Sequence, residues 1–296
     1  MGVVSMSLLA APASAGDDAG ALTLPFTVAA LTRNVPAGLR EALTGSKFAE
    51  HVAGMDSQAR ERAILKEVLA GNLPAFLSKL VPVALSFRQA SGKSISATVF
   101  VMPEYLAIGS DRDFLRIPMN LYTAVAVASK MGFILPTRKI VNAIYEQSAV
   151  HFSPEPMAAG PQMRSTGYYQ THNSKIEEQS RVLGVTPGAL ISGHKKDVVI
   201  TRLLAGNPGR IAIYGWHRPN GVPIQPLSTV HGACYADYSH GIRLVSETVV
   251  VDGQTKSIYD VLLDPVLSHV LSDEGPIPGL RTLMSPPSGD SPCGHS

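Results

Sequence analysis

The order of helical and β patterns along the chain constrains the fold most. Apolar residues with helical spacing define four segments, at 39–52, 57–70, 121–131 and 138–147. The last third is instead rich in short β-type segments, separated by turn sequences at 205–209 and at Asp252-Gly253. Because separate helices and hairpins replace regular β–α–β units, the sequence predicts an α+β fold. We expect a mixed or antiparallel sheet core with flanking helices.

Alternating or β-branched residues predict the strands. They lie at 83–87, 94–102, 105–109, 197–204, 210–216, 222–227 and 242–251. Two prolines make 222–227 an edge strand. Further helical turns are expected at 74–80, 175–183, 258–263 and 266–271, and 153–166 is expected to be a loop.

The length and composition predict one domain flanked by segments without a core of their own. The chain has 296 residues, of which 45% are hydrophobic and 16% are charged, so it can bury a sizeable core. We expect a single α+β domain over 37–276, a linker or extended arm over 16–36 and a disordered tail over 277–296.

The N-terminal 15 residues are typical of a secretory signal peptide. An apolar run at 3–11 precedes Ala13-Ser14-Ala15, a small-x-small cleavage sequence, although no Lys or Arg stands before the run. The sequence therefore predicts a secreted or periplasmic protein. A frayed, alanine-rich helix is the alternative.

Charge and hydropathy exclude two classes of partner. The net charge is +2 without a long basic run, so a nucleic-acid partner is not expected. No apolar run reaches the length of a membrane span. We expect an extracellular polymer or a small-molecule substrate instead.

Two cysteines do not make a disulfide framework. Cys293 lies in the predicted disordered tail. A bridge between Cys234 and Cys293 stays open at this point, and Cys234 is expected to be a small buried residue or a free thiol.

Reactive side chains concentrate between Gly193 and Arg243. They form four short phrases, namely 193–197 (GHKKD), 214–217 (YGWH), 231–232 (HG) and 235–241 (YADYSHG). Each lies at the end of a predicted strand or in the adjoining loop, where sites are commonly built.

A metal site is the first hypothesis for these residues. Neutral histidines and a carboxylate are the usual ligands of a hydrolytic zinc ion, which activates a bound water. The candidate ligands are His217, His231, Asp237 and His240. Their irregular spacing matches no zinc motif, so histidines that bind loop backbone are the alternative. The cofactor expectation is a divalent metal such as zinc, or none.

Acid–base and nucleophilic catalysis are the second hypothesis. The candidate catalytic residues are His240, Asp237, Ser239 and Lys196. Ser239 or Cys234 would act as a nucleophile only within hydrogen-bond reach of a histidine, and the Gly-x-Ser-x-Gly elbow is absent.

Basic and aromatic residues of the same stretch are candidates for binding a substrate. They are Lys195, Tyr214, Trp216, Tyr238 and Arg243. A lysine could meet an anionic group, and the aromatic rings could stack on sugars. Core packing and solvent exposure are the ordinary alternatives.

Several phrases resemble a family of bacterial, often exported proteins. They are 71–77 (GNLPAFL), 135–139 (LPTRK), 193–199 (GHKKDVV), 213–217 (IYGWH), 223–227 (PIQPL) and 235–243 (YADYSHGIR). The resemblance spans roughly 71–276. It implies one common fold and no particular activity.

These observations predict a secreted hydrolase, metal-assisted or not, that acts on a cell-wall or extracellular polymer of peptide or glycan. A non-catalytic glycan-binding module and a Ser/Cys–His hydrolase are the alternatives. The first depends on an exposed aromatic surface, and the second on Ser239 or Cys234 lying beside a histidine.

Overall fold

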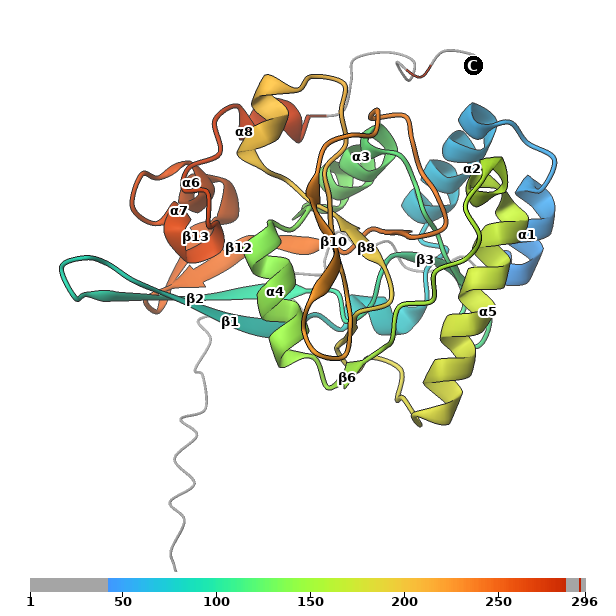
Figure 1. Ribbon diagram of the computed structural model, residues 1–296, viewed down its shortest axis with the longest axis horizontal. Coiled ribbons are helices and arrows are strands. Elements are labelled where there is room, and N and C mark those ends of the chain that lie inside the picture. The colour runs from blue at the N-terminus through green and yellow to red at the C-terminus, as the bar shows by residue number, and fades with distance from the viewer. Residues whose placement is uncertain (1–41, 286–292, 294–296) are drawn as a thin grey trace, which may run out of the picture.

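A five-stranded antiparallel sheet is the larger of the two main sheets in the computed structural model, which describes residues 42–285 and residue 293. Its strands are β1 (Val81–Arg88), β2 (Ser94–Val101), β5 (Phe133–Ile134), β12 (Val245–Val251) and β13 (Gln254–Ser257). The order is β1-β2-β12-β13, with β5 also pairing to β12, and the β1–β2 hairpin reaches the left edge of Figure 1. At the β12–β13 turn, Asp252 and Gly253 have φ of 46° and 79°. Positive φ at both turn residues is typical of a two-residue β-hairpin turn, which the sequence predicted here.

A second, smaller sheet carries the stretch of reactive residues. Its strands are β8 (Lys196–Val198), β9 (Ile213–His217), β10 (Pro223–Ser228) and β11 (His240–Gly241). The order is β10-β9-β8-β11, so β10 is an edge strand as predicted. Strands β8 and β11 are parallel, whereas the other pairs are antiparallel. Two short pairs complete the β structure: β3 (Ala107–Gly109) with β4 (Phe114–Arg116), and β6 (Val150–His151) with β7 (Ile191–Ser192).

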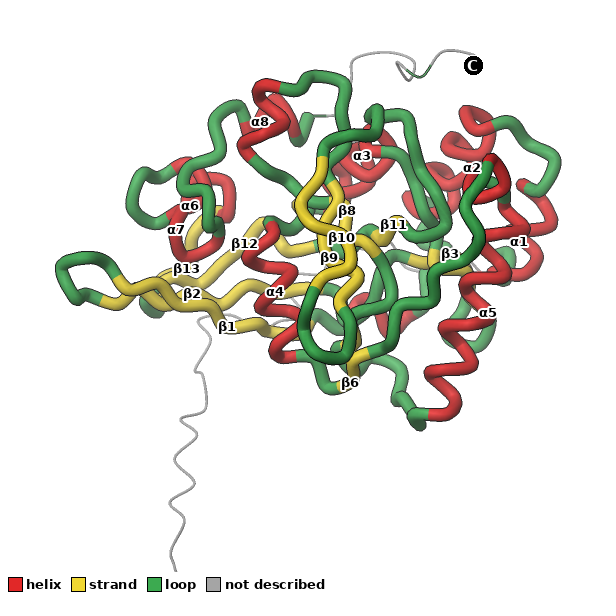
Figure 2. Tube along the Cα trace, viewed as in Figure 1, coloured by secondary structure: helices red, strands yellow, loops and turns green. Residues whose placement is uncertain are grey.

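Helices surround these sheets (Figure 2). They are α1 (Gly45–Val52), α2 (Ser57–Leu69), α3 (Leu121–Met131), α4 (Arg138–Gln147), α5 (Thr166–Val182), α6 (Ile258–Leu263), α7 (Ser268–Leu271) and α8 (Leu280–Leu283). Short 3-10 turns lie at Ala75–Ser78, Pro161–Arg164 and Arg202–Gly206. Side-chain caps fix several starts: Asn120 accepts from Thr123 N before α3, and Thr137 accepts from Ile140 N before α4. The α+β prediction is confirmed.

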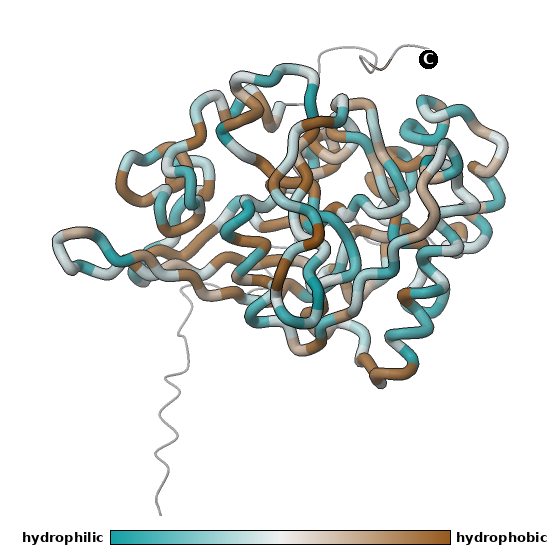
Figure 3. The backbone as a smooth tube through the Cα atoms, viewed as in Figure 1, coloured by the Kyte–Doolittle hydropathy of each residue, from teal (hydrophilic) through white to brown (hydrophobic). Residues whose placement is uncertain are grey.

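The main hydrophobic core lies between the larger sheet and the helices. Hydrophobic segments follow its strands in Figure 3, and Val99, Phe100 and Val101 of β2 are fully buried. None of the helices within residues 42–285 combines the length and apolar character that crossing a membrane requires.

Two segments differ from the predicted secondary structure. Helix α5 begins at Thr166 rather than near residue 175, because the Ser165 side chain caps it there. The sequence did not show this start, because the buried residues of the helix form only one narrow stripe in a polar segment. The strand expected over 197–204 ends at Val198. Residues 202–206 form a 3-10 turn instead. The Thr201 hydroxyl caps the start of this turn by accepting a hydrogen bond from the Leu203 N–H.

The predicted disordered tail is wrong for the part that the structure describes. Ile277, Leu280 and Met284 are buried, and Leu280–Leu283 is helical. These apolar residues are three and four positions apart, so one face of a short segment packs on the core. The domain therefore extends past residue 276. The predicted signal peptide (1–15) and linker (16–36) lie outside the described residues.

Candidate functional site

The parallel pairing of β8 and β11 places two candidate residues side by side. Lys196 and His240 are register partners, and Lys196 N donates to Ser239 O at 2.7 Å. Register partners project from the same face of a sheet. The pairing thus joins two phrases, 193–197 and 235–241, that are far apart in the sequence.

Asp237 forms the acidic centre of this pair. Its Oδ1 accepts the Ser239 N–H at 2.8 Å and the Ser239 hydroxyl at 2.6 Å, and its Oδ2 accepts the Tyr235 hydroxyl at 3.0 Å. Burial acts to raise the pKa of Asp237, but His240, the Ser239 bonds and Lys196 together lower it. Asp237 is therefore ionised at neutral pH.

His240 is buried beside this carboxylate without a hydrogen bond. It is 1% exposed, and neither ring nitrogen has a hydrogen-bond partner among the described residues. Burial lowers the pKa of His240 to about 4, with help from Lys196, while Asp237 opposes the shift. Burial therefore holds the His240 imidazole in its neutral form at neutral pH.

Two partly exposed residues border His240. The His231 ring lies 6.3 Å from the His240 ring, centroid to centroid, and stacks on Tyr235 at 4.2 Å. We call Asp237, His240 and Lys196, with His231 and Tyr235 at their border, the candidate acid–base site.

Lys196 is held over Trp216. Its Nζ lies 5.1 Å from the centroid of the indole ring, and burial lowers its pKa while Asp237 opposes the shift. Trp216 has a φ of 55°, in the left-handed region that large residues rarely adopt, and its N–H donates to Lys195 O at 3.0 Å. Strained backbone of this kind is concentrated at functional sites.

Lys195 is buried behind the site and does not face solvent. It is 1% exposed and its Nζ donates to Tyr238 O at 2.6 Å. Burial lowers its pKa to about 7. The prediction that Lys195 binds a substrate therefore needs correction, because its ammonium is used within the turn that carries Asp237 and His240.

The predicted aromatic platform is also corrected. Tyr214, Trp216 and Tyr238 are all buried. Tyr238 packs edge to face against Trp216 and His172, at 6.3 and 4.9 Å between centroids. Their ring faces are used in packing, so they offer no surface to a sugar.

Arg243 is a core residue and not a substrate ligand. It is fully buried, donates to Met102 O at 2.9 Å and Ile191 O at 2.7 Å, and lies 4.4 Å from the Tyr105 ring centroid. Its charge is satisfied by carbonyls and an aromatic face.

Of the four predicted metal ligands, His231, Asp237 and His240 lie near one another, whereas His217 lies apart. His217 bonds Asn142 Oδ1 at 3.3 Å and stacks on Tyr145 at 4.6 Å, in a separate cluster. Burial and His151 lower its pKa to about 4. Within the described part of the chain, no group of three or more His, Cys, Asp or Glu residues could hold a metal ion.

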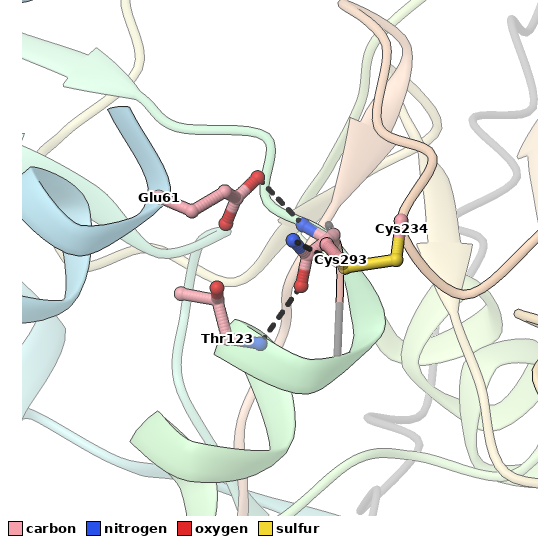
Figure 4. The surroundings of a disulfide bond; sticks show 5 residues. Glu61, Thr123, Cys234 and Cys293 are labelled. Carbon is pink, nitrogen blue, oxygen red and sulfur yellow. Dashed lines mark hydrogen bonds between the residues drawn. A yellow bond between two sulfur atoms is a disulfide. The ribbon is translucent and has the colours of Figure 1, made fainter. Parts of the chain in front are cut away.

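Neither predicted nucleophile is placed for attack. The Ser239 hydroxyl is buried and donates to Asp237, not to a histidine. Cys234 is exposed and forms a disulfide with Cys293, shown in Figure 4, so it is neither the small buried residue nor the free thiol that the sequence favoured. The pairing was missed because Cys293 lies in a segment without a pattern.

A second charge network, buried at Arg116, Glu104 and His194 but partly exposed at Glu177, was not predicted. Arg116 contacts Glu104 at 2.8 Å and Glu177 at 2.6 Å, and His194 bonds Glu104 at 2.8 Å. A cavity of about 280 Å³ is lined in part by Glu104, Arg116 and Glu177. The network pairs these charges with one another, and the cavity lining does not include His240, Asp237 or Lys196. Because the charges of Glu104 and Arg116 are used in pairing with each other, we take the acid–base site as the candidate for catalysis.

Comparisons with protein-family models, with curated proteins and with solved structures found no match. The resemblance to exported bacterial proteins stays a prediction.

Proposed function

We propose that this chain is a hydrolase whose acid–base site is formed by His240, Asp237 and Lys196. The observation that carries the proposal is the buried His240 imidazole, which is the register partner of Lys196 and interacts with the charges of both Asp237 and Lys196. Titratable groups with shifted pKa values and a specific charged partner are typical of catalytic sites.

The three residues have complementary charge states for hydrolysis. Neutral His240 would take a proton from water as the water oxygen attacks the scissile centre, and ionised Asp237 would stabilise the resulting imidazolium. The Lys196 ammonium would stabilise negative charge that develops on the substrate. The proton would then pass from His240 to the leaving group. The route is written without a metal step, and no group of three or more potential ligands occurs among the described residues.

The proposed substrate is an extracellular or cell-wall polymer of peptide or glycan. The Cys234–Cys293 disulfide supports export, because such bonds persist mainly in oxidising compartments. The predicted signal peptide supports it independently. The buried aromatic rings do not favour the glycan-binding alternative, and the Ser239 bonds do not favour a serine nucleophile.

The test is hydrolysis of dye-labelled peptidoglycan and of dye-labelled casein by the mature chain between mildly acidic and neutral pH. We expect His240→Asn and Asp237→Asn to lower the rate by about 100-fold or more, the usual loss when an acid–base group is removed. His217→Asn is the matched control, because His217 is also buried with a pKa near 4 but is bonded to Asn142. A parent that cleaves neither polymer, or a His240→Asn variant with full activity, would overturn the proposal. Metal analysis of the same sample tests the metal-assisted alternative.

A further inference from the structure

The disulfide lies in the loop that leads into the acid–base site. Cys234 is exposed and stands three residues before Asp237, in the connection between β10 and β11. Its partner Cys293 lies at the N-terminal end of α3, next to Asn120 (Figure 4). The Cys234 end of the bond therefore lies in an exposed residue.

The disulfide is the covalent link that holds residues 233–238 of this loop. Ala233 is fixed before it, through Ala233 N to Gly209 O at 2.7 Å, and Tyr238 is fixed after it, through Tyr238 N to Met163 O at 3.0 Å. Between them, Tyr235 makes a local bond to Gly232 O, and Ala236 O accepts a bond of 3.4 Å from the Tyr169 hydroxyl. Loosening this stretch would first affect Tyr235.

Tyr235 connects the disulfide to the site. Its hydroxyl donates to Asp237 Oδ2 at 3.0 Å, and its ring stacks on His231 at 4.2 Å. A displaced Tyr235 would leave one carboxylate oxygen of Asp237 without its donor and would unstack His231. The state of the disulfide is therefore coupled to the geometry of the site.

The surroundings of Cys293 favour its departure as a thiolate. The Asn120 side-chain amide donates to its sulfur at 3.8 Å, and Asn120 is the N-cap of α3. Amide donors and the positive end of a helix dipole stabilise a thiolate. Glu61 accepts the Asn120 N–H at 3.0 Å, and burial raises its pKa to about 7, so its carboxyl adds little negative charge at slightly acidic pH.

We propose that Cys234–Cys293 is a thiol–disulfide exchange site for a dithiol reductant, and that opening it releases Tyr235 from Asp237. One thiolate of the dithiol attacks Cys234 Sγ, the S–S bond breaks, and Cys293 leaves as a thiolate that takes a proton from solvent. The second thiol of the reductant then displaces Cys234 from the mixed disulfide. The protein gains two electrons and two protons, and the dithiol becomes a disulfide. The effect on catalysis rests on the proposed function, whereas the exchange and the loosening do not.

The experiment is hydrogen–deuterium exchange of the full chain before and after treatment with dithiothreitol under native conditions. We expect at least tenfold faster exchange within 233–238 in the reduced protein, reversed by reoxidation, with the β1–β2 hairpin (81–101) unchanged. Cys293→Ser should show the same fast exchange without reductant, and reductant should add nothing to it.

Three results would overturn the inference. They are a bond that dithiothreitol does not reduce in the folded protein, unchanged exchange within 233–238 after reduction, and loss of protection throughout the chain. Polymer hydrolysis measured on the same samples separates the two proposals: altered exchange in a chain that cleaves neither polymer would uphold the exchange site and refute only the hydrolase.

Discussion

Arg116 offers a sharp test of the physical reasoning, because its charge holds a buried network together. It is 2% exposed, and its guanidinium reaches Glu104 through two nitrogens at 2.8 and 2.9 Å. It also donates to Glu177 at 2.6 Å and to Asn173 at 3.1 Å. Arg116→Met keeps much of the volume and removes every one of these bonds.

The expected loss of stability is large and depends on pH. Removing one partner of a buried ion pair costs about 3–5 kcal/mol, which is roughly 6–20 °C in melting temperature for a chain of this size. Burial acts to raise the pKa of Glu104, but Arg116, His194 and Arg243 hold it well below its ordinary value. This stabilisation is present above the ordinary carboxyl pKa of about 4.3 and is lost as pH falls. The variant's deficit should therefore stay nearly constant from pH 7 down to about pH 5 and shrink as pH falls below about 4.3.

Urea unfolding and thermal melts at several pH values measure this loss. Arg281→Met is the matched control, since Arg281 pairs with Asp260 at 2.7 Å on the surface, with both side chains more than half exposed. Such a pair contributes about 0–1 kcal/mol. A deficit for Arg116→Met as small as that of the control, or one that does not change with pH, would refute the reasoning.

Two further substitutions test the packing and charge around the site. Gly241→Ala would place a Cβ 2.6 Å from the Tyr105 ring and 2.8 Å from Lys195 Cβ, so we expect a loss of about 1–3 kcal/mol in urea unfolding, and an unchanged midpoint would contradict it. Burial raises the pKa of Asp197 to about 7 from an ordinary value of about 3.9, so the folded state binds its proton more tightly and wild-type stability falls as pH rises between these values. Asp197→Asn carries no such proton and should gain stability relative to wild type across that window in thermal melts; a constant difference would show that Asp197 does not titrate there.

Local signals in the sequence predicted much of the fold. Helices α3, α4 and α6 begin and end where the sequence placed them. Gly132 ends α3 in the left-handed conformation and the Thr137 side chain caps the start of α4, and both signals are local. The Asp252-Gly253 hairpin is equally local. Residues 277–284 were not predicted to be ordered, because they are held by packing on distant parts of the chain and not by a local signal.

The candidate site was predicted in part. The phrases carrying Lys196, Asp237 and His240 were identified, but which histidines meet depends on the pairing of β8 with β11. Nothing in the spacing of residues shows that His217 turns toward Asn142 while His231 stays near His240. The burial of Lys195 could not be predicted either. Alternation along a strand shows that Lys195 and Lys196 face opposite sides of the sheet, but not which side is buried.

The strand order also has a consequence for synthesis. Strand β2 lies between β1 and β12, and β8 lies between β9 and β11, yet β11 and β12 belong to the last quarter of the chain. A growing chain therefore carries β2 and β8 with open edges until that quarter has left the ribosome. Open edges invite pairing with other chains. The edge of β2 stays open from residue 101 until β12 begins at residue 245, and a C-terminal truncation before Val245 would make that exposure permanent.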